Sequence, residues 1–198
     1  YTLNDSYYIM FLVHSTFGMR PGEICGIGLY DLVLQSRLLT LNYGLDKKKR
    51  FTDLKNTGAQ RTLKIPKALI QPIKKQIEYS NNVRDKTLEY PFLFVLDNGG
   101  AINPDTYTQH LERLIGRINN DSKDIQIKPI TAYGLRHTFA TISILKGVHI
   151  KVVAEVMGDT VETVMTNYAH IIAQVTNDSL ELMANTILGN LSDPEDED

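Results

Sequence analysis

The sequence contains a single cysteine, Cys25, among 198 residues. One cysteine excludes an internal disulfide bond and any metal site built from several cysteines. Because Cys25 lies in the apolar run 24–27, we interpret it as a thiol of the core rather than as a reactive group. A chain without disulfides is typical of the reducing cytoplasm, and we expect this protein there.

Long hydrophobic runs are absent as well. No apolar stretch approaches the roughly 20 residues that a membrane-spanning helix requires, and no signal peptide opens the chain. We therefore expect no contact with a membrane. The sequence starts at Tyr1 rather than at a methionine, which leads us to expect a piece excised from a longer protein.

The chain also lacks an excess of charge of one sign, because 21 basic and 23 acidic residues give a formal net charge of −2. A value near zero at first argues against DNA as a partner. Five of the acids, however, lie within residues 193–198, in an acidic segment 191–198 that we predict to be disordered. Without these five acids the chain carries 21 basic and 18 acidic side chains, a net charge of +3.

Many of the basic residues gather between positions 47 and 67. A consecutive run comes first and spaced residues follow: Lys47, Lys48, Lys49, Arg50, Lys55, Arg61, Lys64 and Lys67. A local concentration of positive charge allows one face of a protein to contact phosphates even when the total charge is small. Lysines at the edge of a hairpin also block pairing with other strands, so charge alone leaves both interpretations open. The first interpretation assigns DNA contacts to Lys47, Lys48, Lys49, Arg50 and Arg61.

Local patterns predict a fold of the α+β class, mostly helical, with one small antiparallel sheet of about three strands, in a single domain over residues 1–190. Helices are predicted over residues 2–17, from Pro21, over 67–82 and 103–118, in three successive segments that end at Gly147, Gly158 and around Tyr168, and over 171–188. Strands are predicted within residues 29–41, 49–54 and 61–65, with a further short buried strand at 92–95. Candidate N-caps are Asn103, Thr131 and Thr160.

Two arginines from distant segments and one late tyrosine form the most informative pattern. Arg20 stands three residues before Glu23, close enough for the carboxylate to orient the guanidinium, although an acid there also suits the first turn of a helix. Arg136 lies in the apolar run 135–144, where an unpaired charge would be costly, and this favours an anionic partner. The planar fork of arginine can hold two non-bridging oxygens of a phosphodiester. A tyrosine near such a phosphate, here Tyr168, can attack it, and the arginines supply the charge stabilisation without a metal or other cofactor.

The order of these segments resembles the tyrosine recombinase (phage integrase) family. The resemblance is carried by Gly18–Glu23, by the Leu-Arg-His-Thr-Phe-Ala-Thr run within 130–141, and by 166–170 around Tyr168. It covers nearly the whole chain, as the catalytic domain of a prokaryotic or phage protein whose N-terminal DNA-binding domains are absent from this chain. It implies the tyrosine recombinase catalytic-domain fold, cleavage and rejoining of double-stranded DNA through a 3′-phosphotyrosyl intermediate, and a tetramer on DNA. The final helix then packs on a neighbouring protomer or on its own domain.

The resemblance also implies roles for individual residues. Arg20 and Arg136 take the two arginine positions, and Tyr168 takes that of the nucleophile. The family's catalytic lysine lies in a β-turn, in a pattern that the segment 55–65 resembles, so Lys55 is assigned as the general acid. The alternatives are that Lys55 is an ordinary edge lysine or that one of Lys47, Lys48 and Lys49 takes the role.

Tyr133 and Asp159 depart from the family's usual residues, which are histidine at the first position and histidine or tryptophan at the second. A tyrosine can donate a hydrogen bond but does not readily accept a proton near neutral pH. An aspartate repels a phosphate unless it is protonated or turned towards an arginine. We predict that Tyr133 donates to the scissile phosphate and that Asp159 turns away from it, towards a neighbouring cation or helix end. His137 and His170 lie close by in sequence, and we interpret both as structural.

Three other functions remain open at this point. The successive helices after residue 138 also fit a helix-turn-helix transcription factor, although that reading leaves Arg20 and Tyr168 without a role. A recombinase relative that binds DNA without cutting it would explain Tyr133 and Asp159. A type IB topoisomerase shares the same chemistry, but the segment pattern is more similar to integrases.

Overall fold

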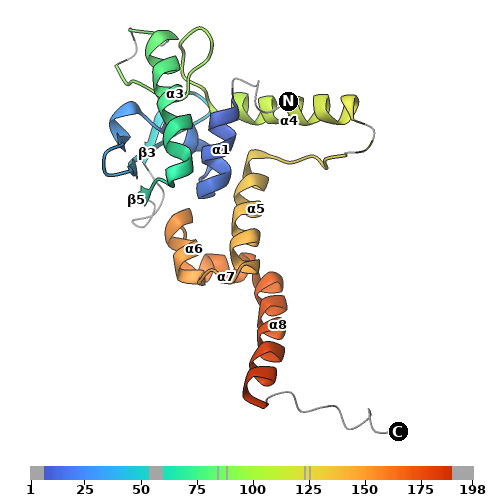
Figure 1. Ribbon diagram of the computed structural model, residues 1–198. Helices are drawn as coiled ribbons and strands as arrows, with labels where there is room; N and C mark the ends of the chain where they lie inside the picture. The colour runs from blue at the N-terminus through green and yellow to red at the C-terminus, as the bar shows by residue number, and fades with distance from the viewer. Residues whose placement is uncertain are drawn as a thin grey trace.

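The computed structural model describes residues 7–53, 60–83, 85–87, 89–122, 124 and 126–188. Lys55 and the acidic segment 191–198 lie outside the described residues, so what was predicted for them stays a prediction. The described part consists of a body and a helical arm (Figure 1). The body contains helices α1 to α4 and the strands, and the arm contains helices α5 to α8.

The first two helices of the body bring Arg20 into place. Helix α1 (Tyr8–Phe17) ends at Gly18, whose φ of 56° is left-handed. A Cβ at Gly18 would lie 2.3 Å from the ring of Phe139 in the arm, so both the backbone conformation and the packing require glycine here. Helix α2 (Pro21–Gly26) begins with its proline, as predicted, and Arg20 is its N-cap.

The strands form two antiparallel sheets. They are β1 (Leu32–Val33), β2 (Leu38–Leu41), β3 (Tyr43–Leu45), β4 (Phe51–Asp53) and β5 (Arg61–Lys64). The larger sheet has the order β1-β2-β5, with Leu39 opposite Leu63, which confirms a three-stranded antiparallel sheet. Strand β4 does not join it, because β4 pairs with β3 in a separate two-stranded sheet.

Two details of the predicted strands differ from the structure. Strand β3 was not predicted, since glycine is depleted in strands and Gly44 lies in its centre. Gly44 fits there because a Cβ would lie 3.3 Å from the carbonyl carbon of Gly22, so β3 can approach α2 closely. The predicted strand at 92–95 is wrong, because Phe92 and Val95 form only single bridges with partners in the loops. The burial predicted for 92–95 is confirmed.

The remaining helices follow the predicted caps. They are α3 (Lys67–Val83), α4 (Pro104–Asp121), α5 (Ala132–Leu145), α6 (Ile150–Met157), α7 (Val161–Asn167) and α8 (Ala169–Leu188). The side chains of Asn103, Thr131 and Thr160 each accept a backbone N–H of the first helical turn, which confirms all three N-caps. Gly158 ends α6 with a φ of 69°. Tyr168 lies at the joint between α7 and α8 rather than inside a helix.

The buried apolar residues form two clusters, one in the body and one in the arm. The arm cluster consists of Ala140, Ile144, Val153, Ala154, Met157, Val164 and Tyr168. Helix α5 belongs to both, because its first residue packs into the body cluster and its later turns into the arm cluster. Figure 1 shows α5 between the body and the other helices of the arm. The candidate site residues therefore lie where the two clusters meet. None of the described helices is long and apolar enough to cross a membrane.

Candidate active site

Arg20 is fixed by Glu23, three residues further along the chain. The backbone N–H of Arg20 donates to Oε2 of Glu23 at 2.8 Å, and Nη1 of Arg20 donates to Oε1 at 2.8 Å. The carboxylate is 1% exposed and also accepts from both terminal nitrogens of Arg61, at 3.0 and 3.3 Å. Burial alone would raise the pKa of Glu23, but the hydrogen bonds and charges of Arg61 and Arg20 hold it below its ordinary value. Glu23 is therefore an anion that orients Arg20.

Arg136 is buried and is held by backbone carbonyls from two elements. Its Nη1 donates to the carbonyl oxygen of Gly18 at 2.6 Å and to that of Met157 at 2.9 Å. Gly18 ends α1 and Met157 ends α6, so the guanidinium closes two helix C-termini at once. Its other terminal nitrogen remains available for an anion.

That anion is Asp159. Oδ2 of Asp159 accepts from Nη2 of Arg136 at 2.6 Å, and Oδ1 accepts from Nη2 of Arg20 at 2.5 Å. Asp159 thus contacts cations, but these are the two arginines expected to hold a phosphate, and its predicted turn away from the phosphate stays a prediction. Arg61, Glu23, Arg20, Asp159 and Arg136 thus form one row of alternating charges.

Tyr168 lies beside this row and contacts a histidine. Its hydroxyl oxygen is 2.8 Å from Nδ1 of His137, and the residue is 4% exposed. Burial raises the pKa of Tyr168; the nearby Arg136 lowers it and Asp159 raises it, with a net upward shift. Tyr168 is therefore a protonated phenol near neutral pH, with an imidazole nitrogen at hydrogen-bond distance.

The other predicted site residues have more exposed positions or lie outside the described residues. Tyr133 is one helical turn before Arg136 on α5 and its side chain is exposed, so it is accessible to a ligand. Its hydrogen bond to a phosphate stays a prediction, as does the role of Lys55. Lys47, Lys48, Lys49 and Arg50 lie in the exposed turn between β3 and β4. Lys47 forms an ion pair with Asp105 of α4 at 3.0 Å, and Arg50 forms one with Asp46 at 2.7 Å.

Arg61 differs from the expected surface contact. Its side chain is only 7% exposed, and its Nε donates to the carbonyl oxygen of Val156 at 2.7 Å in addition to the bonds with Glu23. These contacts tie β5 to α2 and α6. The geometry therefore favours Arg61 as a residue that positions Glu23, while contact with DNA stays a prediction.

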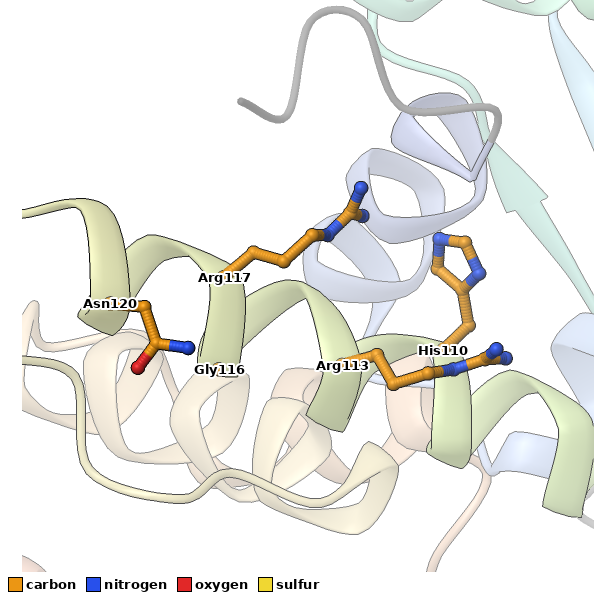
Figure 2. Close-up of a pocket in the computed structure, with 5 residues that line it drawn as sticks. All are labelled: His110, Arg113, Gly116, Arg117 and Asn120. Carbon is orange, nitrogen blue, oxygen red and sulfur yellow. The ribbon is translucent and has the colours of Figure 1, made fainter.

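A basic hollow that sequence analysis did not single out lies on α4. It has a volume of about 460 Å³ and is lined by His110, Arg113, Gly116, Arg117 and Asn120. Figure 2 shows that His110 and Arg117 project from α4 on the side of α1. The helical spacing of the side chains at 110, 113, 117 and 120 is the signal that could have revealed it.

Three contacts at the site were not predicted from sequence. His137 was interpreted as structural, because no local pattern connects it with Tyr168, 31 residues away. The carbonyl groups of Gly18 and Met157 carry no side-chain signal at all.

Among the described residues, no group of three or more histidine, cysteine, aspartate or glutamate side chains is arranged to hold a metal ion.

The fold and this arrangement of arginines and tyrosine define the class of the protein, which has a tyrosine recombinase catalytic-domain fold. The profile of the phage integrase family matches residues 2–174, and the chain belongs to that family.

Individual relatives agree with this family. A "Tyrosine recombinase" of Thermosipho africanus is 29% identical over 165 residues, which are 83% of this chain and 49% of that protein. "Tyrosine recombinase XerA" of Pyrococcus furiosus is 27% identical over 187 residues, 91% of this chain and 56% of the relative. The solved structure of the Tn1549 transposon integrase in complex with transposon right end DNA has a TM-score of 0.77 at 22% identity. It covers 90% of this chain and 59% of that one. The chain thus spans about half the length of the curated relatives that it matches.

Proposed function

We propose that this chain is the catalytic domain of a site-specific DNA recombinase, an integrase of a mobile element that acts in the cytoplasm of a prokaryotic host. The observation that carries the proposal is the convergence of Arg20 and Arg136 on one anion. Tyr168 lies close enough for the charge of Arg136 to act on its pKa. The two arginines belong to segments more than 100 residues apart. A pair of converging guanidiniums suits the oxygens of a phosphodiester.

In the proposed reaction, the phenolic oxygen of Tyr168 attacks the phosphorus of one DNA strand. A bond forms between that oxygen and phosphorus, the bond from phosphorus to the 5′ oxygen breaks, and the strand is left with a 3′-phosphotyrosyl link and a free 5′-hydroxyl. Arg20 and Arg136 stabilise the charge that builds up on the non-bridging oxygens. Attack by a 5′-hydroxyl on the phosphotyrosyl link then rejoins the DNA and restores the tyrosine.

Two protons move in this reaction. The 5′ oxygen gains one, which we assign to Lys55 on the resemblance alone. Tyr168 loses one, and Nδ1 of His137 is placed to accept it at 2.8 Å. This requires a neutral imidazole with its hydrogen on Nε2, so that the tyrosine hydroxyl donates to Nδ1. His137 would then supply the proton acceptor that Tyr133 does not provide.

The proposed partners are double-stranded DNA and further copies of the chain. Lys47, Lys48, Lys49 and Arg50 offer exposed positive charge for the DNA backbone, and the basic hollow on α4 offers more. Helix α8 leaves Leu180, Leu182, Met183 and Ile187 more than half exposed. Leu180, Met183 and Ile187 share one face of the helix by their spacing. Such an exposed apolar face supports packing against a neighbouring protomer, and we propose a tetramer on DNA.

One observation favours a second candidate function. Asp159 forms ion pairs with both Arg20 and Arg136, the two arginines of the proposed phosphate clamp. This fits a relative that binds DNA without cutting it. Family membership and the row of alternating charges make a helix-turn-helix transcription factor the weaker reading, since that reading gives Arg20, Glu23 and Tyr168 no function.

Covalent trapping on DNA separates cutting from binding alone. Nicked duplexes made from the DNA on either side of the gene would be incubated with the chain in EDTA and then treated with SDS. The proposal predicts an SDS-resistant adduct with the wild-type chain and none with Tyr168→Phe, since the arginines neutralise the phosphate without a metal. Binding without any adduct would support the second candidate. A strict need for Mg²⁺ would point to a nuclease-type site instead.

A further inference from the structure

The carboxylate of Asp159 binds two different arginines, one through each oxygen. The distance is 2.5 Å from Oδ1 to Nη2 of Arg20 and 2.6 Å from Oδ2 to Nη2 of Arg136. A phosphodiester would present two non-bridging oxygens to the same pair of nitrogens. An anion of the chain itself therefore takes the place in which the clamp would hold a phosphate.

The charges around the clamp show what this contact changes. Arg20, Arg61 and Arg136 contribute three positive charges, and Glu23 and Asp159 contribute two negative ones. The row carries a net charge of +1 with Asp159 and would carry +2 without it. The side chains of Asp159 and Arg136 are 14% and 6% exposed, so solvent screens this pair less than it screens a surface pair. Asp159 thus removes half of the positive charge that a phosphate would meet.

The two arginines do not depend on Asp159 for their positions. Arg20 is anchored on Glu23 by its own N–H and by Nη1. Arg136 is anchored through Nη1 on the carbonyl groups of Gly18 and Met157. Nη2 of Arg20 also donates to the carbonyl oxygen of Gly158 at 3.1 Å. Because each guanidinium has its own anchors, loss of the Asp159 contact leaves the pair in place and frees one N–H of Nη2 on each.

The backbone at Asp159 is held by hydrogen bonds, in the short segment between α6 and α7. The N–H of Asp159 donates to the carbonyl oxygen of Ala154 at 3.0 Å, and Gly158 donates to that of Glu155 at 3.3 Å, which closes the end of α6. Asp159 itself precedes Thr160, the N-cap of α7. Rotation about the bond from Cα to Cβ can therefore move the carboxylate out of the clamp without moving α6, α7 or either arginine.

From these contacts we infer that Asp159 is a built-in competitor, which occupies the oxyanion site of Arg20 and Arg136 until a phosphate of bound DNA displaces it. The inference rests on the proposed function, because it takes the arginine pair to be a phosphate site. It gives Asp159 a role that differs from orienting the arginines. A competitor weakens the binding of small phosphates when present, whereas an orienting residue strengthens it.

Titration with inorganic phosphate, followed by calorimetry, separates these two roles. Asp159→Asn keeps the shape of the side chain and removes the competing charge. We expect it to bind phosphate at least about tenfold more tightly than the wild-type chain, since a phosphate then gains a charged hydrogen bond without displacing one. Asp97→Asn is the matched control, because it removes one negative charge from an exposed side chain that accepts from Tyr79 in the body. It should bind phosphate as the wild type does, and Arg136→Lys added to Asp159→Asn should abolish the gain.

Phosphate binding by Asp159→Asn that is equal to the wild type, or weaker, would overturn the inference. Thermal unfolding checks that the variant folds, and Asp159→His serves as a second variant in which tighter phosphate binding is also expected. If neither variant folded, the arginines would depend on Asp159 after all, and the inference would again fail. The proposed function fails separately: tighter phosphate binding by Asp159→Asn, with no DNA adduct from any form of the chain, would keep the competitor and remove the cutting activity.

Discussion

Nδ1 of His137 lies 2.8 Å from the hydroxyl oxygen of Tyr168. The family's usual histidine is replaced by Tyr133 on the same helix, four residues before His137. These two facts together suggest that the proton acceptor has moved by one helical turn along α5. Because the pKa of Tyr168 is raised by burial, the hydroxyl needs such an acceptor to react near neutral pH.

Replacing His137 with alanine should therefore slow adduct formation by roughly 10²–10⁴-fold, the usual contribution of a general base. His170→Ala is the control, since His170 is exposed and stands only two residues after Tyr168 in sequence. DNA with sulfur in place of the bridging 5′ oxygen needs no proton on its leaving group. With that DNA, His137→Ala should still cleave slowly, whereas Lys55→Ala should recover its cleavage rate. Unchanged cleavage by His137→Ala would return His137 to a structural role.

Lysine at either arginine position should reduce cleavage by roughly 10²–10³-fold, by analogy with the loss of one oxyanion donor. The two variants should differ in stability. Arg20 is partly exposed, whereas Arg136→Lys leaves the carbonyl groups of Gly18 and Met157 with a poorer partner. We expect Arg136→Lys to lower the free energy of unfolding by about 1–3 kcal/mol, and Arg20→Lys by less. Urea denaturation and single-turnover cleavage, measured on the same preparations, check both parts. Near-normal cleavage by either variant would remove that arginine from the clamp.

His14 provides a prediction about pH and stability. Its Nε2 lies 2.8 Å from the carbonyl oxygen of Met19, which can only accept, so Nε2 carries the hydrogen and Tyr107 donates to Nδ1 at 2.7 Å. Burial lowers the pKa of His14 from 6.5 to about 4; the bond to Met19 and the charge of Glu23 oppose this shift, and the charge of Arg136 contributes to it. Between these two values the unfolded chain binds more protons than the folded chain, so stability falls as pH falls from 6.5 to about 4. The loss attributable to His14 is on the order of 3 kcal/mol.

Urea denaturation at a series of pH values measures this loss. His14→Gln should be less stable at pH 7 but should lack most of the slope in that window. The carboxylate of Glu23, whose pKa is lowered, contributes its own loss at more acidic pH, as its folded-state pKa is reached. An equal slope in the wild type and in His14→Gln would contradict the assignment to His14.

Tyr133 tests the remaining departure from the family. Its side chain is 55% exposed, so substitution should change stability by less than about 0.5 kcal/mol. Tyr133→Phe should slow cleavage by the equivalent of roughly 1 kcal/mol, one neutral hydrogen bond. Tyr133→His should match or exceed the wild-type rate, because histidine can both donate and accept. If Tyr133→Phe cleaved as fast as the wild type, Tyr133 would serve only in packing.

The helices could be predicted from sequence because their signals are local. Asn103, Thr131 and Thr160 each accept the backbone N–H three residues further on and so cap the helix that follows directly. Gly18 and Gly158 adopt the left-handed backbone that ends a helix. The pairing of β3 with β4 was not predictable in this way. It depends on Gly44 fitting against Gly22, a contact between segments 22 residues apart.

The site was predictable in its residues but not in their contacts. Arg20, Arg136 and Tyr168 stand in recognisable runs, but nothing in those runs shows that Asp159 joins the two arginines. In the same way, a basic residue near other basic residues suggests a surface position. The side chain of Arg61 is only 7% exposed instead, because its partner Glu23 comes from a helix 38 residues earlier. Long-range ion pairs of this kind become visible only in the folded chain.

The proposed function requires that Tyr168, among ten tyrosines, attacks DNA. Peptide mapping of the SDS-resistant adduct by mass spectrometry identifies the attacking residue. We expect the nucleotide remnant on the peptide containing Tyr168, joined through a 3′ phosphate, and no labelled peptide from Tyr168→Phe. A remnant on any other tyrosine, or on a serine, or an adduct that persists in Tyr168→Phe, would contradict it.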